Sequence, residues 1–246
     1  MRLMETDDRY QPLLYYIVFG SDVSELVVSR TKHHVDTIPQ GLEIEQLNRQ
    51  EHGERMDWLL NGTIEKVLRQ HDATLYDTCK DTDCWTILRG RIATDGGSDY
   101  LRNTIGLVQA LIEQGGIGVF DLLTLDLQPA SKWSARYFEK ETDPQTHVVV
   151  LKSDNEDGSV WLHTRGMIKF GRPDFSVLQL APSQVNDAKQ ALDQLIFHSG
   201  KGAEMSKKLR LHTANGKTID AQLRLVPDFD NFDFNNAYYE TELKLQ

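Results

Sequence analysis

Apolar and polar positions along the chain follow two spacings, one typical of helices and one typical of strands. Apolar residues recur every three or four positions in residues 98–114 and 183–198, which predicts two amphipathic helices. Ser98 and Ser183 precede these stretches and are suited to cap them. Residues 54–70 show the same spacing, but Asn61-Gly62 interrupts it, so the pattern predicts two helices or one kinked helix. A short helix capped by Ser131 is expected over 131–139.

Strands are expected wherever β-branched and aromatic residues form short runs between turn residues. Residues 31–53 are polar and mixed, and we expect a loop with some helix there. Residues 146–151 are strongly β-branched and predict a buried strand. Asn215-Gly216 favours a tight hairpin turn. The other expected strands are 13–20, 25–30, 74–79, 85–92, 117–120, two within 160–180, 209–213, 219–226 and 238–245.

The order of these elements predicts the fold class. Strands come in runs and hairpins rather than in strict alternation with helices, which indicates an α+β fold with mostly antiparallel sheets and two main amphipathic helices. Each clear helix is followed by strands, so two similar halves are conceivable. We expect an N-terminal half over 1–142 and a C-terminal half over 143–246, with a single domain as the alternative.

Charge narrows the classes of partner. The chain has 246 residues, with 27 Lys and Arg against 37 Asp and Glu, and a net charge of −10. This balance argues against nucleic acid and against anionic membrane surfaces, and it suits solubility or a basic protein partner. No apolar run is long enough to span a bilayer, and no signal peptide is recognised, so we expect a cytoplasmic protein. Cys79 and Cys84 are then expected to be reduced thiols.

The strand over 160–165 carries the best candidate for a site. Its alternation places Trp161, His163 and Arg165 on one face. Arg165 is suited to grip a carboxylate or phosphate, His163 to act as acid or base, and Asp174 to orient either of them. The alternative is an outward polar face, with Trp161 packed under the next element and Arg165 paired with a surface acid.

Other motifs indicate turns and loops rather than cofactor chemistry. Gly166 and Gly171 resemble a loop that cradles an anion, but the lysine of a phosphate-binding loop is missing, so a turn is favoured. Cys79 and Cys84 lack a second pair of zinc ligands, and adjacent His33 and His34 would point to opposite faces of a strand. No metal, cofactor or known catalytic motif is therefore expected.

Three aspartates near the C-terminus resemble a calcium loop, but the glycine and glutamate that such a loop requires are absent. They lie instead in an acidic segment rich in phenylalanine, a composition that suits docking to another protein. The aspartates are Asp228, Asp230 and Asp233.

The segment from Trp161 to Leu180, read as W-L-H-T-R-G-M-x-K-F-G-R-P-D-F, resembles a pattern found in uncharacterised bacterial cytoplasmic proteins. The resemblance implies a bacterial source and, by association, an immunity-type or interaction role, and it supplies no catalytic residue.

Together these features predict a non-enzymatic, acidic protein that binds another protein, as an immunity or accessory factor. The alternative is an enzyme or a binder of small anions that uses Trp161, His163 and Arg165. A structural subunit of a larger assembly is a third possibility. A pocket beside His163 would favour the alternative.

Overall fold

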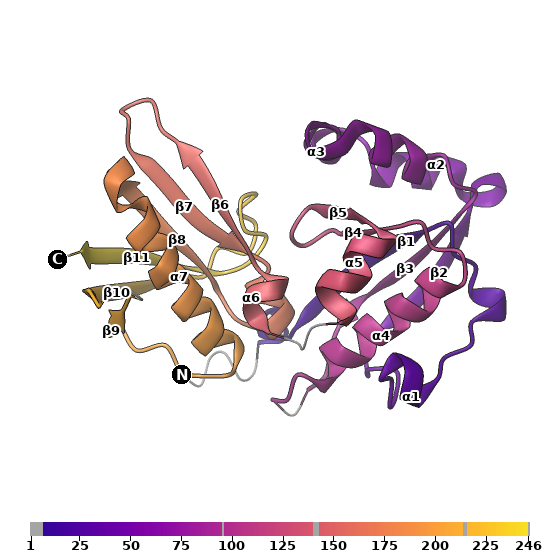
Figure 1. Cartoon of the computed structure of the whole chain (residues 1–246), viewed down its shortest axis with the longest axis horizontal. Helices are drawn as coiled ribbons and strands as arrows, with labels where there is room; N and C mark the ends of the chain where they lie inside the picture. Colours follow the sequence, from indigo (N-terminus) through magenta and orange to yellow (C-terminus); the bar gives the residue numbers. More distant parts are fainter. Residues whose placement is uncertain (1–6, 95, 140–142, 214–215, 246) are drawn as a thin grey trace. The chain divides into compact units, whose positions relative to one another are not determined.

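The computed structural model describes residues 7–94, 96–139, 143–213 and 216–245 (Figure 1). The chain forms two compact units, one over residues 13–142 and the other over 143–246 together with the N-terminal segment through Pro12. Residues 7–12, expected in the first half, thus belong to the second unit. There the ring of Tyr10 lies edge-on to that of Phe229, with 5.2 Å between centroids. Within the described residues, no helix is both long and apolar enough to cross a membrane.

The first unit is built on a five-stranded sheet in the order β2-β3-β1-β4-β5, with all neighbours antiparallel. Its strands are β1 (Leu13–Phe19), β2 (Glu43–Asn48), β3 (Cys84–Arg91), β4 (Gly118–Asp121) and β5 (Asp126–Pro129). Its helices are α1 (Arg30–His33), α2 (Arg49–Leu59), α3 (Thr63–Lys80), α4 (Asp99–Glu113) and α5 (Ala130–Trp133), which runs into a π-helical turn over Ser134–Phe138. A 3-10 turn covers Val23–Glu25.

Strand β1 lies at the centre of this sheet and is covered on both faces. Ile17 and Phe19 point into an apolar cluster that includes Met56 of α2 and Tyr76 of α3. The intervening residue Val18 points to the opposite face, where the buried side of α4 packs. A strand that is buried on both faces reads as a continuous apolar run, which is why LLYYIVF was recognisable in the sequence.

The second unit has a six-stranded sheet in the order β6-β7-β8-β11-β10-β9, in which only β8 and β11 run parallel. Its strands are β6 (Val149–Asp154), β7 (Val160–Arg165), β8 (Asp174–Leu180), β9 (Lys208–His212), β10 (Thr218–Val226) and β11 (Tyr238–Leu245). Its helices are α6 (Pro144–His147) and α7 (Val185–Gly200), and 3-10 turns cover Asp8–Tyr10, Met167–Phe170 and Pro182–Gln184. The buried residues of α7, such as Leu192 and Leu195, pack against the sheet.

The predicted α+β class with largely antiparallel sheets is confirmed. The two sheets differ in strand number and order, so the units are not two copies of one fold. The helix break at Asn61-Gly62 is confirmed, since α2 ends before it and α3 begins after it. The strand over 238–245 and the pairing of β9 with β10 are also as predicted. Asn215, in the predicted hairpin turn, lies outside the described residues.

The strand expected over 74–79 was wrong, because this segment is the end of α3. The helix has a kink at Asp72, whose backbone angles are not helical, and Tyr76 and Cys79 are buried on the part after the kink as Leu68 is on the part before it. Thr78 is accommodated by donating its hydroxyl to the carbonyl oxygen of Thr74, one turn earlier, at 2.8 Å. Burial of this face against the sheet outweighs the β propensity of the threonines.

The strand expected over 25–30 was also wrong. Val27 and Val28 are exposed, and Ser29 begins α1 by accepting a hydrogen bond from the backbone nitrogen of Lys32. The segment 31–53 contains β2, which pairs with β3. The residues expected to form a buried strand over 146–151 end α6 and begin β6, an edge strand on which Leu151 is exposed.

The predicted caps need smaller corrections. Ser98 precedes α4 but makes no capping hydrogen bond through its side chain. Helix α7 begins at Val185, after a 3-10 turn that contains Ser183. Helix α5 begins at Ala130, with Pro129 rather than Ser131 before it.

Candidate functional site

The predicted strand face of Trp161, His163 and Arg165 is covered by another part of the chain. His163 is 5% exposed and Arg165 is 7% exposed. The covering segment is the connection between β10 and β11, residues 227–237, which we call the acidic loop. The two sequence candidates, the strand face and the acidic segment, therefore form one structure.

Aromatic rings fill the space between β7 and the acidic loop. The rings of Trp161 and His163 stack with 4.1 Å between centroids, and Phe234 of the loop stands edge-on to His163 at 5.4 Å. Phe234 in turn stacks on Tyr238 at 4.2 Å. The indole nitrogen of Trp161 donates to the hydroxyl of Ser176 on β8 at 2.9 Å. These contacts make the face a small aromatic core.

Arg165 binds the backbone of the acidic loop. Its Nη1 donates to the carbonyl oxygen of Phe232 at 3.1 Å and to that of Asp233 at 3.2 Å. Buried carbonyl groups need hydrogen-bond partners, and a guanidinium supplies several donors in a fixed geometry. The group that the sequence offered for binding an anion thus holds a turn of the protein's own chain.

The ring of His163 is buried in this core. Its Nδ1 is buried and has no hydrogen-bond partner among the described residues. Burial lowers the pKa of His163, the positive charge of Arg165 lowers it further, and the nearby carboxylate of Asp233 opposes both effects. Because the ring is also closed in by aromatic neighbours, its environment favours packing over proton transfer.

Asp174 links β7, the turn after it and the acidic loop. It is fully buried, and one carboxylate oxygen accepts from Thr164 Oγ1 at 2.7 Å and from the backbone nitrogen of Met167 at 3.2 Å. The other oxygen accepts from Asn236 Nδ2 at 2.8 Å. Burial raises the pKa of Asp174 to about 6, although these hydrogen bonds and Arg165 lower it in part. None of these bonds orients His163 or Arg165, the role expected for this carboxylate.

The three aspartates of the acidic loop point to solvent. Asp228, Asp230 and Asp233 are exposed, and no ion pair joins them to any other described residue. Between them, the ring of Phe232 is 86% exposed. The loop therefore presents an apolar ring among acidic groups on a backbone that Arg165 holds from below.

The glycines after β7 serve the turn. Gly166 and Gly171 have positive φ angles of 119° and 63°. A Cβ atom on Gly171 would lie 2.4 Å from the carbonyl oxygen of Tyr10, so only glycine fits this close approach. Their geometry favours the turn over an anion cradle.

Both cysteines are free thiols, and burial raises the pKa of Cys79 to about 12, which makes it a poor nucleophile. In the part of the chain that the structure describes, no group of three or more His, Cys, Asp or Glu residues is placed to hold a metal ion.

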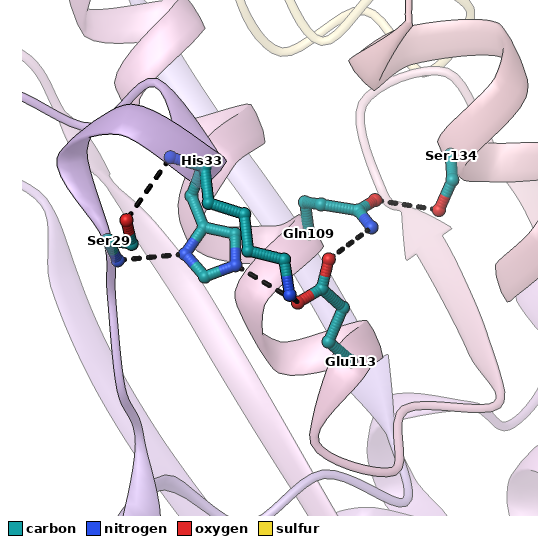
Figure 2. Close-up of polar contacts among 6 residues, drawn as sticks. Ser29, His33, Gln109, Glu113 and Ser134 are labelled. Carbon is teal, nitrogen blue, oxygen red and sulfur yellow. Dashed lines mark hydrogen bonds and ion pairs between the residues drawn. The ribbon is translucent and has the colours of Figure 1, made fainter.

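A second polar cluster, in the first unit, was not anticipated from the sequence. Ser29, through its backbone nitrogen, donates to Nδ1 of the buried His33 at 2.9 Å, and Nε2 of His33 lies 3.1 Å from Glu113 on α4 (Figure 2). Because Nδ1 accepts a hydrogen bond, the network assigns the proton to Nε2. Glu113 also pairs with Lys32 and accepts from Gln109, which accepts from Ser134 at 2.7 Å.

This cluster ties the segment around α1 to α4 and to the π-helical turn. The hydroxyl of Ser29 caps α1 and does not contact the imidazole, so the arrangement lacks the nucleophile-to-base contact of a catalytic triad. From the sequence, the adjacent pair His33 and His34 indicates only a weak metal motif. No sequence pattern links His33 to Glu113, which lies 80 positions away in the chain.

Comparisons with models of protein families, with curated proteins and with solved structures find no match for this chain. The resemblance to uncharacterised bacterial proteins stays a prediction.

Proposed function

We propose that this protein is a non-enzymatic binding protein that docks onto a basic protein partner through the acidic loop, with Phe232 as the apolar anchor. An immunity or accessory role would be one such function. The observation that carries the proposal is the contrast within the loop. Phe232 is 86% exposed, while Phe234, two residues later, is 4% exposed and packs into the aromatic core.

The loop is held in place before any partner arrives. Arg165 binds two of its carbonyl groups, and Asn231 accepts hydrogen bonds from the backbone nitrogens of Phe234 and Asn235 through its own carbonyl. A pre-ordered loop loses little conformational entropy on binding, so more of the contact energy of an exposed ring is retained as affinity. Aromatic residues are enriched at the centres of protein interfaces.

The charges around Phe232 indicate the chemistry of the partner. Asp228 and Asp230 precede Phe232 in the acidic loop and Asp233 follows it, all three are exposed, and the whole chain carries a net charge of −10. Acidic groups around an apolar anchor complement a basic surface with an apolar pocket, and they accelerate association at low salt. We therefore expect a partner whose docking face is rich in Lys and Arg.

The geometry gives the alternative, a catalytic or anion-binding site at Trp161, His163 and Arg165, less support. Arg165 already donates to loop carbonyl groups, and His163 is enclosed by rings. A ligand would have to displace the acidic loop to reach either side chain.

The test is site-directed photocrosslinking of the full-length protein in cells of its source. Phe232 is replaced by the photoreactive analogue p-benzoylphenylalanine, and Leu178, an exposed apolar residue of β8 (55% exposed), is replaced in the same way as the control. We expect one basic protein to be captured from position 232 and not from position 178. With that protein purified, Phe232→Ala should weaken binding about tenfold or more. The aspartate-to-asparagine variants should slow association at low salt and change it little at high salt.

The proposal fails if position 232 captures no distinct protein, or captures the same set as position 178. It also fails if the captured protein binds Phe232→Ala as tightly as the unchanged protein. Capture from position 58 instead, where Trp58 of α2 is also exposed, would place the docking surface on the first unit.

A further inference from the structure

The second unit contains a cavity of about 650 Å³, a volume typical of sites for small molecules. It lies between the end of α7, the segment 201–207 that follows it, and strands β10 and β11. Arg172 and Pro173, which precede β8, complete the lining. None of the residues of the proposed docking loop lines this cavity.

The cavity lies on the sheet face opposite the aromatic core of Trp161 and His163. Tyr239, which lines it, pairs with Phe175 of β8, and their rings stack with 5.6 Å between centroids. The next residue on β8, Ser176, pairs with His163. Since successive side chains of a strand point to opposite faces, Tyr239 and His163 lie on different sides of the sheet.

The polar groups of the cavity are mainly cationic. Arg172 and Lys207 line it, and neither has an ion-pair partner among the described residues. Arg172 uses Nη2 to donate to the carbonyl oxygen of Gly202 at 3.2 Å, which orients the guanidinium and leaves other donors available. Arg224 also contributes to the lining but is paired with Glu240, and Glu204 is the acidic residue of the lining.

Two further features favour a ligand. Ser199, on α7, is almost fully buried and lines the cavity, and its hydroxyl oxygen has no hydrogen-bond partner in the described part of the chain. Buried hydroxyl groups are normally hydrogen-bonded, so an unpartnered one at a cavity wall suits a ligand atom. Apolar side chains, including Leu223 and Met205, form much of the remaining wall with the ring of Tyr239.

We propose that this cavity binds a small organic anion, with its carboxylate or phosphate group at Arg172 and Lys207 and a flat apolar body beside Tyr239. A guanidinium matches the two oxygens of such groups with parallel hydrogen bonds, and Lys207 adds a second positive charge. Ser199 donates its hydroxyl to a polar substituent of the ligand. In a chain of net charge −10, a cavity with this excess of cations selects anions against the overall field of the protein.

The test is isothermal titration calorimetry of the full chain with four probes: naphthoate, naphthyl phosphate, the neutral naphthalenemethanol and inorganic phosphate. We expect at least one of the two aromatic anions to bind with a dissociation constant below about 1 mM, a weak but measurable affinity. The neutral probe, which lacks the anion, and inorganic phosphate, which lacks the apolar body, should bind at least tenfold more weakly. The ratio of naphthoate to naphthyl phosphate affinity identifies which anionic group the site prefers.

Variants locate the binding. Arg172→Gln and Lys207→Gln should each weaken binding of the aromatic anion about tenfold or more, and Ala203→Trp, which places a large ring in the lining, should abolish it. Lys189→Gln, an equal change of charge on an exposed residue of α7 that does not line the cavity, is the matched control and should bind normally. Circular dichroism checks that each variant is folded. If Arg172→Gln does not fold, the affinity of Lys207→Gln for the aromatic anion is the test of the proposal.

The proposal is overturned if neither aromatic anion binds, if the neutral probe binds equally well, or if Arg172→Gln and Lys207→Gln bind as the control does. Phe232→Ala, the variant that tests the docking proposal, does not change the cavity lining and should bind the probes normally. The two proposals can therefore fail independently.

Discussion

Arg165 and Phe232 lie 67 positions apart in the chain, yet Nη1 of the first donates to the carbonyl oxygen of the second at 3.1 Å. The arginine, which the sequence offered for binding an anion, is a buried support, and the phenylalanine, which lies in the acidic segment, has its ring in solvent. Arg165 thus fixes the backbone of Phe232 while the ring of Phe232 stays exposed.

Replacing Arg165 with methionine should destabilise the second unit and release the acidic loop. The change keeps most of the side-chain volume but leaves the carbonyl groups of Phe232 and Asp233 unpartnered, at a cost of about 2–4 kcal/mol in the free energy of unfolding. Urea denaturation measures this loss, and hydrogen exchange of the loop amides should become faster. Arg210→Met, which removes an exposed arginine paired with Asp220 on β10, should cost much less than Arg165→Met, because exposed ion pairs contribute little to stability. Equal losses for the two variants would contradict the supporting role of Arg165.

Two phenylalanines of the acidic loop should respond in opposite ways to truncation. Phe234→Ala removes a buried ring that touches His163 and Tyr238, and it should lower the free energy of unfolding by about 3–5 kcal/mol. Phe232→Ala removes an exposed ring and should change it by less than about 0.5 kcal/mol. Thermal or urea unfolding of both variants is the measurement. A large loss for Phe232→Ala would mean that its ring packs within the protein and is not free to dock.

Asp174 should make the protein less stable as the pH rises from about 4 to about 6. Burial raises its folded pKa to about 6, above the ordinary value of 3.8, so in this range the folded state keeps a proton that the unfolded state has lost. The loss amounts to about 3 kcal/mol for this carboxyl, because one pKa unit corresponds to about 1.4 kcal/mol. The measurement is the difference in free energy of unfolding between the unchanged protein and Asp174→Asn at each pH. A difference that stays constant from pH 4 to pH 7 would refute the raised pKa.

Glu113 should show the opposite dependence at lower pH. Its hydrogen bonds with Lys32, then with His33 and Gln109, hold its folded pKa at about 2 against an ordinary 4.5. The stability it contributes is therefore present above about pH 4.5 and is lost as the pH falls toward 2. Because the side chain is partly exposed, Glu113→Gln should cost only about 1 kcal/mol at neutral pH, and this gap should close by pH 2. The control is Glu65→Gln, which breaks an exposed pair with Arg69 within α3 and should show a smaller change.

Two helical glycines should respond differently to alanine. A Cβ atom on Gly106 of α4 would lie 1.9 Å from the carbonyl oxygen of His33 and 2.5 Å from Val35 Cγ2, so Gly106→Ala must push the α1 segment away. We expect a loss of about 1–3 kcal/mol despite the better helix propensity of alanine. Gly53 of α2 meets only Arg49 Cγ, at 3.9 Å, and Gly53→Ala should stabilise the protein by about 0.5–1 kcal/mol. Stabilisation by both changes would show that α1 does not pack closely on α4.

Residues with a strong local pattern could be assigned from the sequence. The run LLYYIVF of β1, the helices α4 and α7, the interruption at Asn61-Gly62 and the strand β11 were all recognisable. Each depends on contacts that repeat along the element itself, at a period of two or of about 3.6 residues. Two segments were misassigned, at 25–30 and at 74–79. Both contain β-branched or apolar residues, and their secondary structure depends on which part of the chain packs beside them.

Alternation along β7 by itself determined that Trp161, His163 and Arg165 share a face, and composition determined that the chain is acidic. Only the tertiary structure decided what covers that face, which arginines remain available and where a cavity opens. Arg165 and Arg172 are both charged and close in sequence, yet one binds the acidic loop and the other lines the cavity. The reason is that side-chain periodicity is a local property, whereas burial and hydrogen-bond partners depend on segments brought together from far along the chain.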